Sequence, residues 1–214
     1  MTPGPGLVDR FPTLRKVPVI GIVRGYPPES AESAALVAIE EGIQLIEVTL
    51  DSPHALDVVE RLSGRASGGM VGVGTMTVAS QVGPAAEAGA SFAVTPTFSE
   101  AVIDACTALD LPVISGAATP TEILNAFEAG ASAVKVFPAE QLGGPSFVRA
   151  ILRPLGDPPL VPTGGVTPEN VLGYLQSGAV AVGAGSSLFP EEIGQTSDWN
   201  ALRQLVRQWI DAIA

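Results

Sequence analysis

The 214-residue chain contains two lysines, and one of them, Lys135, lies within the apolar stretch ASAVKVFPAE at residues 131–140. Burying an unpaired ammonium group is costly, so we expect the pKa of a lysine in such a stretch to fall toward neutrality. A neutral amine is the nucleophile that attacks a ketone to form a Schiff base. Lys135 is therefore a candidate nucleophile. The alternative is a lysine that extends outward to solvent or pairs with a structural carboxylate.

A second charged residue interrupts an apolar stretch at Glu47, in LIEVTL at residues 45–50. If both side chains point into one cavity, Glu47 and Lys135 face each other across it. Schiff-base reactions need a group that carries protons, and a carboxyl group with a raised pKa can supply one. Glu47 is therefore a candidate acid–base residue. The alternative is an ion-pair partner that keeps Lys135 charged.

Three further features could bind an anion. Arg24, in GIVRG, carries a planar fork of donors that suits a carboxylate or a phosphate, although a plain surface arginine fits the same context. The glycine-rich stretches PTGGVTPEN (162–170) and VGAGSSLF (182–189) each follow an apolar stretch. Where such loops lead into helix N-termini, backbone amides bind phosphate without any net positive charge. We therefore expect a phosphate site at these two loops.

Composition excludes several partners. The formal net charge of −11 argues against nucleic acid or an anionic membrane surface as the main partner. Two uncharged windows, 66–86 and 170–190, are broken by Gly, Ser, Gln and Pro, so neither predicts a transmembrane helix. The N-terminal stretch lacks an apolar core, so we expect no secretory signal. Cys106 stands alone and predicts a buried helix residue, which is compatible with a reducing cytoplasm.

Metal chemistry is not favoured by the residue types present. His54 is the only histidine in the sequence, and no cluster of cysteine and histidine exists. We expect His54 at the surface near the start of a helix. A single histidine in that place does not support a Ser-His-Asp triad. An all-carboxylate magnesium site stays open as an alternative.

Eight short apolar stretches alternate along the chain with helical patterns. They lack clean polar alternation, which indicates a parallel sheet covered on both faces. The expected strands are residues 17–23, 45–50, 70–74, 91–95, 112–115, 133–137, 160–163 and 180–184.

The segments between the strands carry helix start and stop signals. Helices are expected at 27–42, 119–130 and 167–178, each opening near a proline and ending at a glycine. The pentapeptide EAGAS occurs at 87–91 and at 128–132, and each copy predicts a left-handed glycine that ends a helix before a strand. The C-terminal segment 197–214 predicts an amphipathic closing helix.

This alternation predicts a single (β/α)₈ TIM barrel across residues 1–214, with a short N-terminal helical segment; a doubly wound open sheet is the alternative. Chemistry in such barrels is located at the C-terminal ends of the strands and in the loops that follow. That rule selects Arg24, Glu47, Thr75, Pro96, Lys135, Thr163 and Ser186.

Six motifs in order make residues 15–190 resemble a known family: LIEVTL, VGVGTM, VTP, VKVFPAE, PTGGVTPEN and GAGSSL. They are similar to the 2-keto-3-deoxy-6-phosphogluconate (KDPG) aldolase family. That family also includes 2-keto-3-deoxy-6-phosphogalactonate aldolases and 4-hydroxy-2-oxoglutarate (KHG) aldolases. The resemblance implies a class I aldolase with a (β/α)₈ fold that uses neither a metal nor another cofactor, acts on a phosphorylated keto acid and is commonly a homotrimer.

The resemblance also implies roles for individual residues. Lys135 corresponds to the Schiff-base lysine and Glu47 to the acid–base glutamate. The implied substrate-binding residues are Arg24, Thr75, Pro96, Phe137 and Thr163. The implied phosphate-binding residues are Gly164, Gly165, Gly185 and Ser186.

One position departs from the family pattern. Where several gluconate-type members have an arginine that helps to hold the substrate carboxylate, this sequence has Asp51, in TLDSPHA. An acid cannot make that contact, so either Arg24 carries more of it or the substrate differs. The LDSP stretch is closer to the NSP pattern of galactonate-type members, whereas Thr163 favours the gluconate form.

The first hypothesis is a lyase that cleaves KDPG to pyruvate and glyceraldehyde 3-phosphate, with the galactonate epimer or KHG as alternative substrates. A phosphosugar isomerase or synthase of the same barrel type would use Glu47 as a base without a covalent step. A third hypothesis is a non-catalytic barrel that binds phosphosugars.

Overall fold

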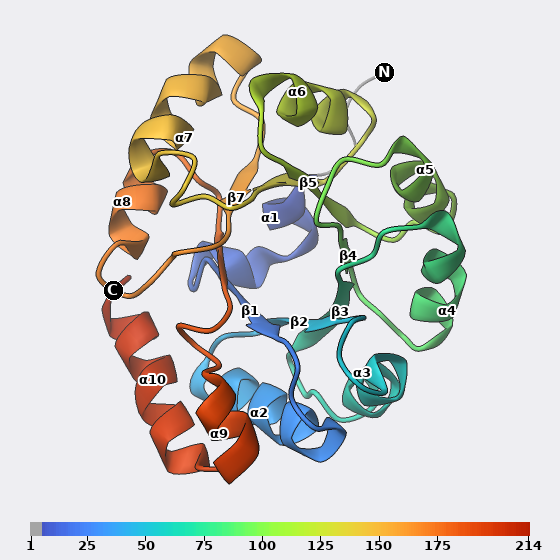
Figure 1. The fold of residues 1–214 in the computed structure, drawn as a ribbon, viewed down its shortest axis with the longest axis vertical. Helices are drawn as coiled ribbons and strands as arrows, with labels where there is room; N and C mark the ends of the chain where they lie inside the picture. Colours follow the sequence, from blue (N-terminus) through green and yellow to red (C-terminus); the bar gives the residue numbers. More distant parts are fainter. Residues whose placement is uncertain (1–5) are drawn as a thin grey trace.

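Residues 6–214 are described by the computed structural model of the chain, which shows eight strands surrounded by helices (Figure 1). Residues 1–5 belong to the predicted domain and to the stretch in which no secretory signal is expected, and they lie outside the described residues. The strands are β1 Val19–Val23, β2 Leu45–Thr49, β3 Met70–Gly74, β4 Ala93–Val94, β5 Val113–Ala117, β6 Ala133–Val136, β7 Leu160–Pro162 and β8 Val182–Ala184. Each overlaps a predicted strand.

The strands pair in parallel in the order β7-β6-β5-β4-β3-β2-β1-β8. An isolated parallel bridge between Thr163, directly after β7, and Gly183 of β8 brings the two ends of this sheet together. Each strand therefore lies beside its neighbours in sequence, and the sheet forms a nearly closed ring. The predicted (β/α)₈ barrel is confirmed, and the alternative of an open doubly wound sheet is wrong.

Helices alternate with the strands around the outside of the barrel (Figure 1). They are α2 Pro28–Glu41, α3 Ala55–Ser63, α4 Val82–Glu87, α5 Glu100–Ala108, α6 Pro120–Glu128, α7 Gly144–Leu152, α8 Val171–Gln176, α9 Glu191–Thr196 and α10 Trp199–Asp211, with 3₁₀ turns η2 Ala79–Gln81 and η3 Arg153–Leu155. The N-terminal helix α1 Leu7–Arg10 and the 3₁₀ turn η1 Pro12–Arg15 lie instead at one end of the barrel. The glycines expected to end helices have positive φ, namely Gly42, Gly89, Gly130 and Gly178. Only glycine adopts this conformation without steric cost, so these positions stop the helices as predicted.

One helix begins later than its sequence indicates. The Thr-Pro signal at 167–168 predicts a helix from that point, but α8 begins at Val171. The Asn170 side chain accepts a hydrogen bond from Thr167 N–H at 2.9 Å and donates one to the Gly165 carbonyl at 2.8 Å. These bonds hold the preceding residues in a turn, because an asparagine side chain competes with the helical backbone for its partners.

The short N-terminal helical segment closes one end of the barrel. Leu7, Phe11 and Leu14 are buried in one cluster with apolar residues from the interior of the barrel. The Phe11 and Phe92 rings meet edge to face at 5.7 Å, and Leu7 N–H donates to the Ser132 carbonyl at 3.1 Å. The opposite end, where the strands have their C-termini, is left open.

A second and larger apolar layer lies between the sheet and the helices. The predicted amphipathic C-terminal helix is α10, and it packs against α2 with Trp209 fully buried (Figure 1). Arg207 of α10 pairs with Glu41 of α2 at 2.8 Å. Within residues 6–214, no helix has the length and apolar character needed to cross a membrane.

Candidate active site

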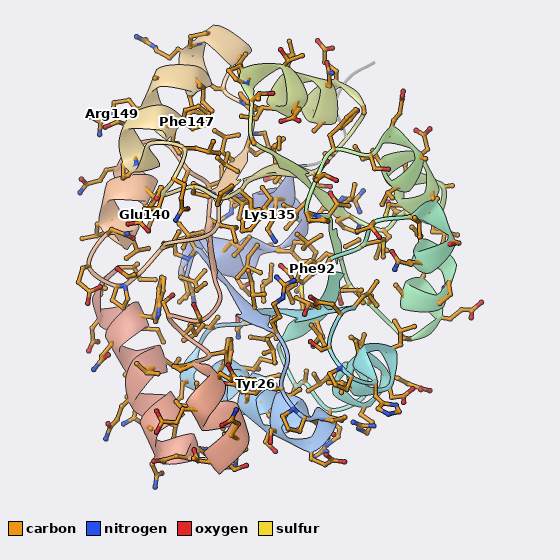
Figure 2. All side chains as sticks on the ribbon, viewed as in Figure 1. Tyr26, Phe92, Lys135, Glu140, Phe147 and Arg149 are labelled. Carbon is orange, nitrogen blue, oxygen red and sulfur yellow. The ribbon has the colours of Figure 1, made fainter. Side chains whose placement is uncertain are left out.

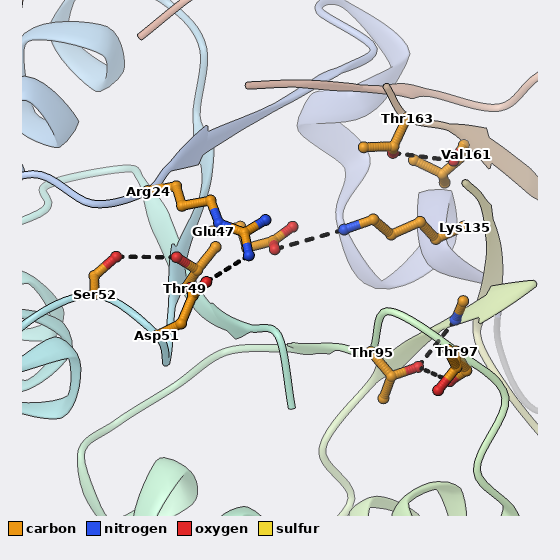
Figure 3. A network of polar contacts seen from close by, with 11 residues as sticks. Arg24, Glu47, Thr49, Asp51, Ser52, Thr95, Thr97, Lys135, Val161 and Thr163 are labelled. Carbon is orange, nitrogen blue, oxygen red and sulfur yellow. Dashed lines mark hydrogen bonds and ion pairs between the residues drawn. The ribbon is translucent and has the colours of Figure 1, made fainter. Parts of the chain in front are cut away.

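Lys135 on β6 and Glu47 on β2 extend into the interior of the barrel and face each other (Figure 3). Lys135 Nζ lies 3.7 Å from Glu47 Oε1, and the two side chains are 10% and 2% exposed. Their strands are buried along their whole length, so the two polar groups meet in otherwise apolar surroundings. The structure thus brings together the amine and the carboxyl group that the sequence singled out.

Glu47 has the environment of a carboxyl group that holds a proton. Burial raises the pKa of Glu47 above its ordinary value, and the positive charges of Lys135 and Arg24 oppose this rise only in part. Glu47 Oε1 has no hydrogen-bond partner among residues 6–214. Its separation from Lys135 Nζ, 3.7 Å, is longer than a hydrogen bond. The carboxyl group is therefore free to exchange a proton with a molecule bound beside the amine.

Glycines on neighbouring strands make room for these side chains. A Cβ atom at Gly74, the last residue of β3, would collide with the Glu47 carboxylate. A Cβ atom at Gly183 of β8 would collide with the Thr163 hydroxyl. The absence of side chains at these two positions leaves space for polar groups inside the barrel.

A cavity of about 910 Å³ opens around Lys135 and Glu47, bounded by the C-terminal ends of the strands. This volume is in the range of sites that enclose a small molecule. Its lining includes every residue that the sequence and the resemblance selected: Arg24, Glu47, Thr75, Pro96, Lys135, Phe137, Thr163, Gly164, Gly165, Gly185 and Ser186. The Phe137 ring lies against the lysine, with its centroid 5.7 Å from Lys135 Nζ.

On one side of the cavity, Arg24 forms an ion pair with Asp51 (Figure 3). The two side chains are 59% and 41% exposed. Burial acts to raise the pKa of Asp51, but hydrogen bonds from the Thr49 hydroxyl and the Arg24 guanidinium outweigh it and hold this pKa below its ordinary value. Asp51 is therefore an anion at neutral pH, and it partly neutralises the cation that lines the cavity.

On another side, the two glycine-rich loops present backbone donors. Gly164 and Gly165 have φ of 92° and 78°, so their loop takes a path open to glycine. Among residues 6–214, no protein acceptor receives a hydrogen bond from the N–H groups of Gly165, Gly185 or Ser186. Such free amides suit an anion. The two stretches lead into helices as expected, since α8 and α9 begin at Val171 and Glu191, but these free amides lie several residues before the first helical residue.

His54 and Cys106, which the sequence does not favour as site residues, lie away from the cavity. His54 precedes α3 as its N-cap, is exposed, and pairs through Nδ1 with Asp57 at 3.1 Å. Cys106 is buried on α5, and burial raises the pKa of its thiol to about 11. Within the described part of the chain, no group of three or more His, Cys, Asp or Glu side chains is placed to hold a metal ion.

The sequence model of a family described as "Aldolase: KDPG and KHG aldolase" matches residues 11–205 of this chain. The chain belongs to the KDPG and KHG aldolase family. Members of this family break carbon–carbon bonds, so the protein is a carbon–carbon lyase.

The similarity of this aldolase to its relatives extends over most of its length. A 2-dehydro-3-deoxy-phosphogluconate aldolase of Pseudoalteromonas atlantica is 32% identical, covering 92% of each chain. A probable 2-dehydro-3-deoxy-6-phosphogalactonate aldolase of Rhizobium meliloti is 38% identical, covering 85% of this chain and 87% of the relative. The solved KDPG aldolase of Legionella pneumophila holds pyruvate as a covalent carbinolamine and superposes with a TM-score of 0.83 at 29% identity, covering 91% of this chain and 94% of its own.

Two residues that shape the aldolase site, Thr95 and Gly116, were not selected from the sequence. Thr95 Oγ1 accepts a hydrogen bond from Gly116 N–H at 2.9 Å and donates one to the Thr97 carbonyl at 2.7 Å (Figure 3). A Cβ atom at Gly116 would collide with the backbone of Pro96. These contacts hold the Pro96 loop over the cavity. The only sequence signal was the position of VTP at the end of an expected strand.

Thr75 carries a second unexpected feature. Its φ is 58°, a left-handed conformation that is strained for a β-branched residue. Thr75 directly follows β3 and lines the cavity. Strained residues of this kind cluster at functional sites, where the surrounding structure maintains them.

Proposed function

We propose that this aldolase cleaves KDPG to pyruvate and glyceraldehyde 3-phosphate through a Schiff base on Lys135. The observation that carries the proposal is the pairing of a buried amine with a buried carboxyl group, 3.7 Å apart, at a cavity of substrate size. An amine of this kind is a nucleophile toward the keto group, and the carboxyl group is a proton carrier. The covalent pyruvate carbinolamine held by the Legionella pneumophila relative supports the same chemistry.

The reaction follows from these two groups. Lys135 Nζ attacks C2 of the keto acid, and loss of water from the carbinolamine gives an iminium ion. Loss of the C4 hydroxyl proton then breaks the C3–C4 bond, releases the aldehyde and leaves the bonding electrons in an enamine. Protonation at C3 and hydrolysis of the iminium ion release pyruvate and restore the amine. Glu47 delivers and removes these protons through water.

The rest of the cavity accounts for the two ends of the substrate. Arg24 is the cation that receives the carboxylate of the keto acid, because its guanidinium supplies paired donors. Gly164, Gly165, Gly185 and Ser186 are proposed to bind the phosphate through backbone amides. This arrangement reconciles an anionic substrate with a chain of net charge −11.

The middle of the substrate would lie near Thr163, Thr75 and Pro96, which line the cavity between the two ends. Thr163 Oγ1 donates to the Val161 carbonyl at 3.3 Å, which leaves the oxygen lone pairs available to a substrate hydroxyl. Phe137, which is 40% exposed, covers the lysine from the solvent side of the cavity.

The proposal extends to the organisation of the molecule. It takes the enzyme to be a homotrimer of single-domain chains (1–214) in the cytoplasm, with no cofactor beyond the Schiff base and with neither nucleic acid nor membrane as a partner. Family membership supports the trimer, and the negative charge supports the absence of nucleic acid. The uninterrupted alternation of strands and helices from β1 to β8 supports a single domain.

Borohydride trapping with pyruvate tests the proposal. Reduction of a Schiff base makes the adduct permanent, so we expect the intact mass to rise by one reduced pyruvyl group, located at Lys135 by peptide mapping. Lys135→Ala should give neither adduct nor turnover. An unchanged mass in the wild-type protein would overturn the proposal and favour an isomerase, a synthase or a binding protein, none of which forms this bond.

A further inference from the structure

We propose that Asp51 is a positioning residue that holds the Arg24 guanidinium at the rim of the cavity, ready to receive the carboxylate of the keto acid. The inference rests on the proposed function. Asp51 Oδ2 accepts a hydrogen bond from Arg24 Nη2 (Figure 3). Among the described residues, Arg24 lines the cavity and Asp51 does not. The hydrogen bond to Arg24 is therefore the contact that links Asp51 to the cavity.

The backbones that carry the pair are fixed to each other. Gly25 N–H donates to Ser52 Oγ at 2.8 Å, and Ser52 N–H donates to the Thr49 carbonyl at 2.9 Å. The Thr49 and Ser52 hydroxyls also lie within hydrogen-bonding distance, at 3.0 Å (Figure 3). These bonds join the loop after β1, which carries Arg24, to the loop after β2, which carries Asp51.

The loop after β1 is held from its other side as well. Tyr26 is buried, and its hydroxyl donates to the Pro190 carbonyl at 2.5 Å. The Tyr26 ring meets Phe189 edge to face at 6.4 Å (Figure 2 shows Tyr26 below the centre of the barrel). Because the backbone around Arg24 is fixed in this way, the freedom that remains at this position is in the arginine side chain.

Asp51 restricts that freedom. Arg24 is 59% exposed, and within residues 6–214 its side chain makes no hydrogen bond other than the one to Asp51. A long side chain without a partner samples many rotamers, and a ligand that orders it must overcome the lost entropy. Asp51 orders the guanidinium before a substrate arrives. The depressed pKa of Asp51 keeps this acceptor charged across the neutral range.

The charge of Asp51 has the opposite effect on an anionic substrate, because it offsets the charge of Arg24. Both side chains are substantially exposed, so solvent screens this repulsion. Two substitutions separate charge from orientation. Asp51→Asn removes the charge but keeps an oxygen that accepts from Arg24, whereas Asp51→Ala removes both.

The experiment measures the pyruvate concentration that gives half-maximal borohydride trapping at Lys135. We expect Asp51→Asn to need no more pyruvate than the wild type, because the guanidinium stays ordered. Asp51→Ala should need about fivefold more pyruvate than Asp51→Asn, since the arginine must be ordered on binding. If Asp51→Ala reaches half-maximal trapping at a pyruvate concentration equal to or lower than that of Asp51→Asn, the proposal is overturned.

A double-mutant cycle tests whether Asp51 acts through Arg24. In an Arg24→Ala background, Asp51→Ala should cause no further change in half-saturation. An equal rise with and without Arg24 would show that Asp51 acts independently, which overturns the positioning role. Asp9→Ala is the matched control, because it breaks an exposed pair with Arg15, 2.9 Å long, that is remote from the cavity.

The same measurements separate this inference from the proposed function. A wild-type protein that forms no adduct would refute the Schiff base, and with it any role for Arg24 in holding a keto acid. A second outcome is that the wild type forms the adduct normally while Asp51→Asn and Asp51→Ala give the same dependence of trapping on pyruvate concentration. That outcome would leave the aldolase chemistry intact and overturn the role of Asp51 alone.

Discussion

At the scale of single residues, Glu47 combines burial, a raised pKa and proximity to an amine. A surface glutamate would be ionised at neutral pH and would hold a nearby lysine in its charged form. A buried carboxyl group beside a lysine can instead pass a proton to a reacting atom. The structural arrangement of Glu47 and Lys135 therefore favours proton transfer over a simple ion pair.

Replacing Glu47 by glutamine tests that role. Glu47→Gln preserves the size of the side chain and removes its ability to transfer a proton. We expect kcat to fall by about 10²–10⁴-fold, the usual contribution of general acid–base catalysis. Steady-state cleavage of KDPG measures the effect, with circular dichroism as a control for folding. Turnover like that of the wild type would reduce Glu47 to a structural partner of Lys135.

The raised pKa of Glu47 also predicts how stability depends on pH. The folded protein holds this proton above the ordinary glutamate pKa of 4.5, whereas the unfolded chain releases it there. The contribution of Glu47 to the free energy of unfolding is therefore present below pH 4.5 and is lost as pH rises through the folded-state pKa. Relative to Glu47→Gln, the wild type should lose stability with rising pH in urea denaturation. A pH-independent difference would contradict the prediction.

Sequence could identify these residues because a charge in an apolar strand is conspicuous in the chain itself. It could not show that Arg24 is paired with Asp51, because 27 positions separate them and their contact depends on adjacent strands. Nor did it reveal the left-handed Thr75, since a β-branched residue gives no signal for positive φ.

At the scale of the elements, strands were easier to predict than helix starts. The mostly apolar runs of β2 and β6 are buried along their whole length, as expected for strands of a covered parallel sheet, so their predicted bounds were close. The start of α8 was misplaced because the Thr-Pro signal competes with Asn170, whose side chain bonds to the backbone of its own loop. Whether a side chain of this kind bonds to the loop or leaves the backbone helical depends on the local geometry, which the sequence does not show.

Strand β3 gives a test of how an element controls the site. A methyl group at Gly74 would occupy the space of the Glu47 carboxylate. Gly74→Ala should therefore displace Glu47 and lower kcat by about 10²-fold, a loss at the lower end of that for removing the acid–base group. Kinetics on KDPG measure the loss, and a kcat within twofold of the wild type would contradict the prediction.

Gly83 on α4 provides the matched control for this substitution. A Cβ atom at Gly83 would have no heavy atom within 4 Å, and its φ is not positive. Gly83→Ala should leave kcat unchanged and raise the free energy of unfolding by about 0.5–1 kcal/mol, because alanine favours the helix.

At the scale of the whole molecule, closure of the barrel brings residues from distant parts of the chain to one cavity. Arg24 and Ser186 lie near opposite ends of the sequence, and the pairing of β1 with β8 brings both into the wall of one cavity. The repeat of strand and helix predicted this closure, because each βα unit adds one strand beside the last. The bridge from Thr163 to Gly183 that joins the ends has no counterpart in any local pattern.

The relative kcat/KM values of different substrates should show which end of the cavity contributes to binding. KDPG and its galactonate epimer carry a phosphate that the free amides near Gly165 and Ser186 can bind, whereas KHG does not. Loss of two charge-assisted hydrogen bonds corresponds to a fall in kcat/KM on the order of 10²-fold for KHG.

The two epimers differ only at the C4 hydroxyl, which would lie between Thr163 and the Arg24 side of the cavity. Because the Thr163 oxygen is free to accept from that hydroxyl, we expect KDPG to be preferred slightly over the galactonate form. Parallel measurement of kcat/KM on the three substrates decides both points. A preference for the galactonate epimer would mean that the Asp51 side of the cavity, and not Thr163, determines specificity. A preference for KHG would refute the phosphate site while leaving the chemistry of Lys135 in place, because the Schiff base forms at the end of the substrate that all three share.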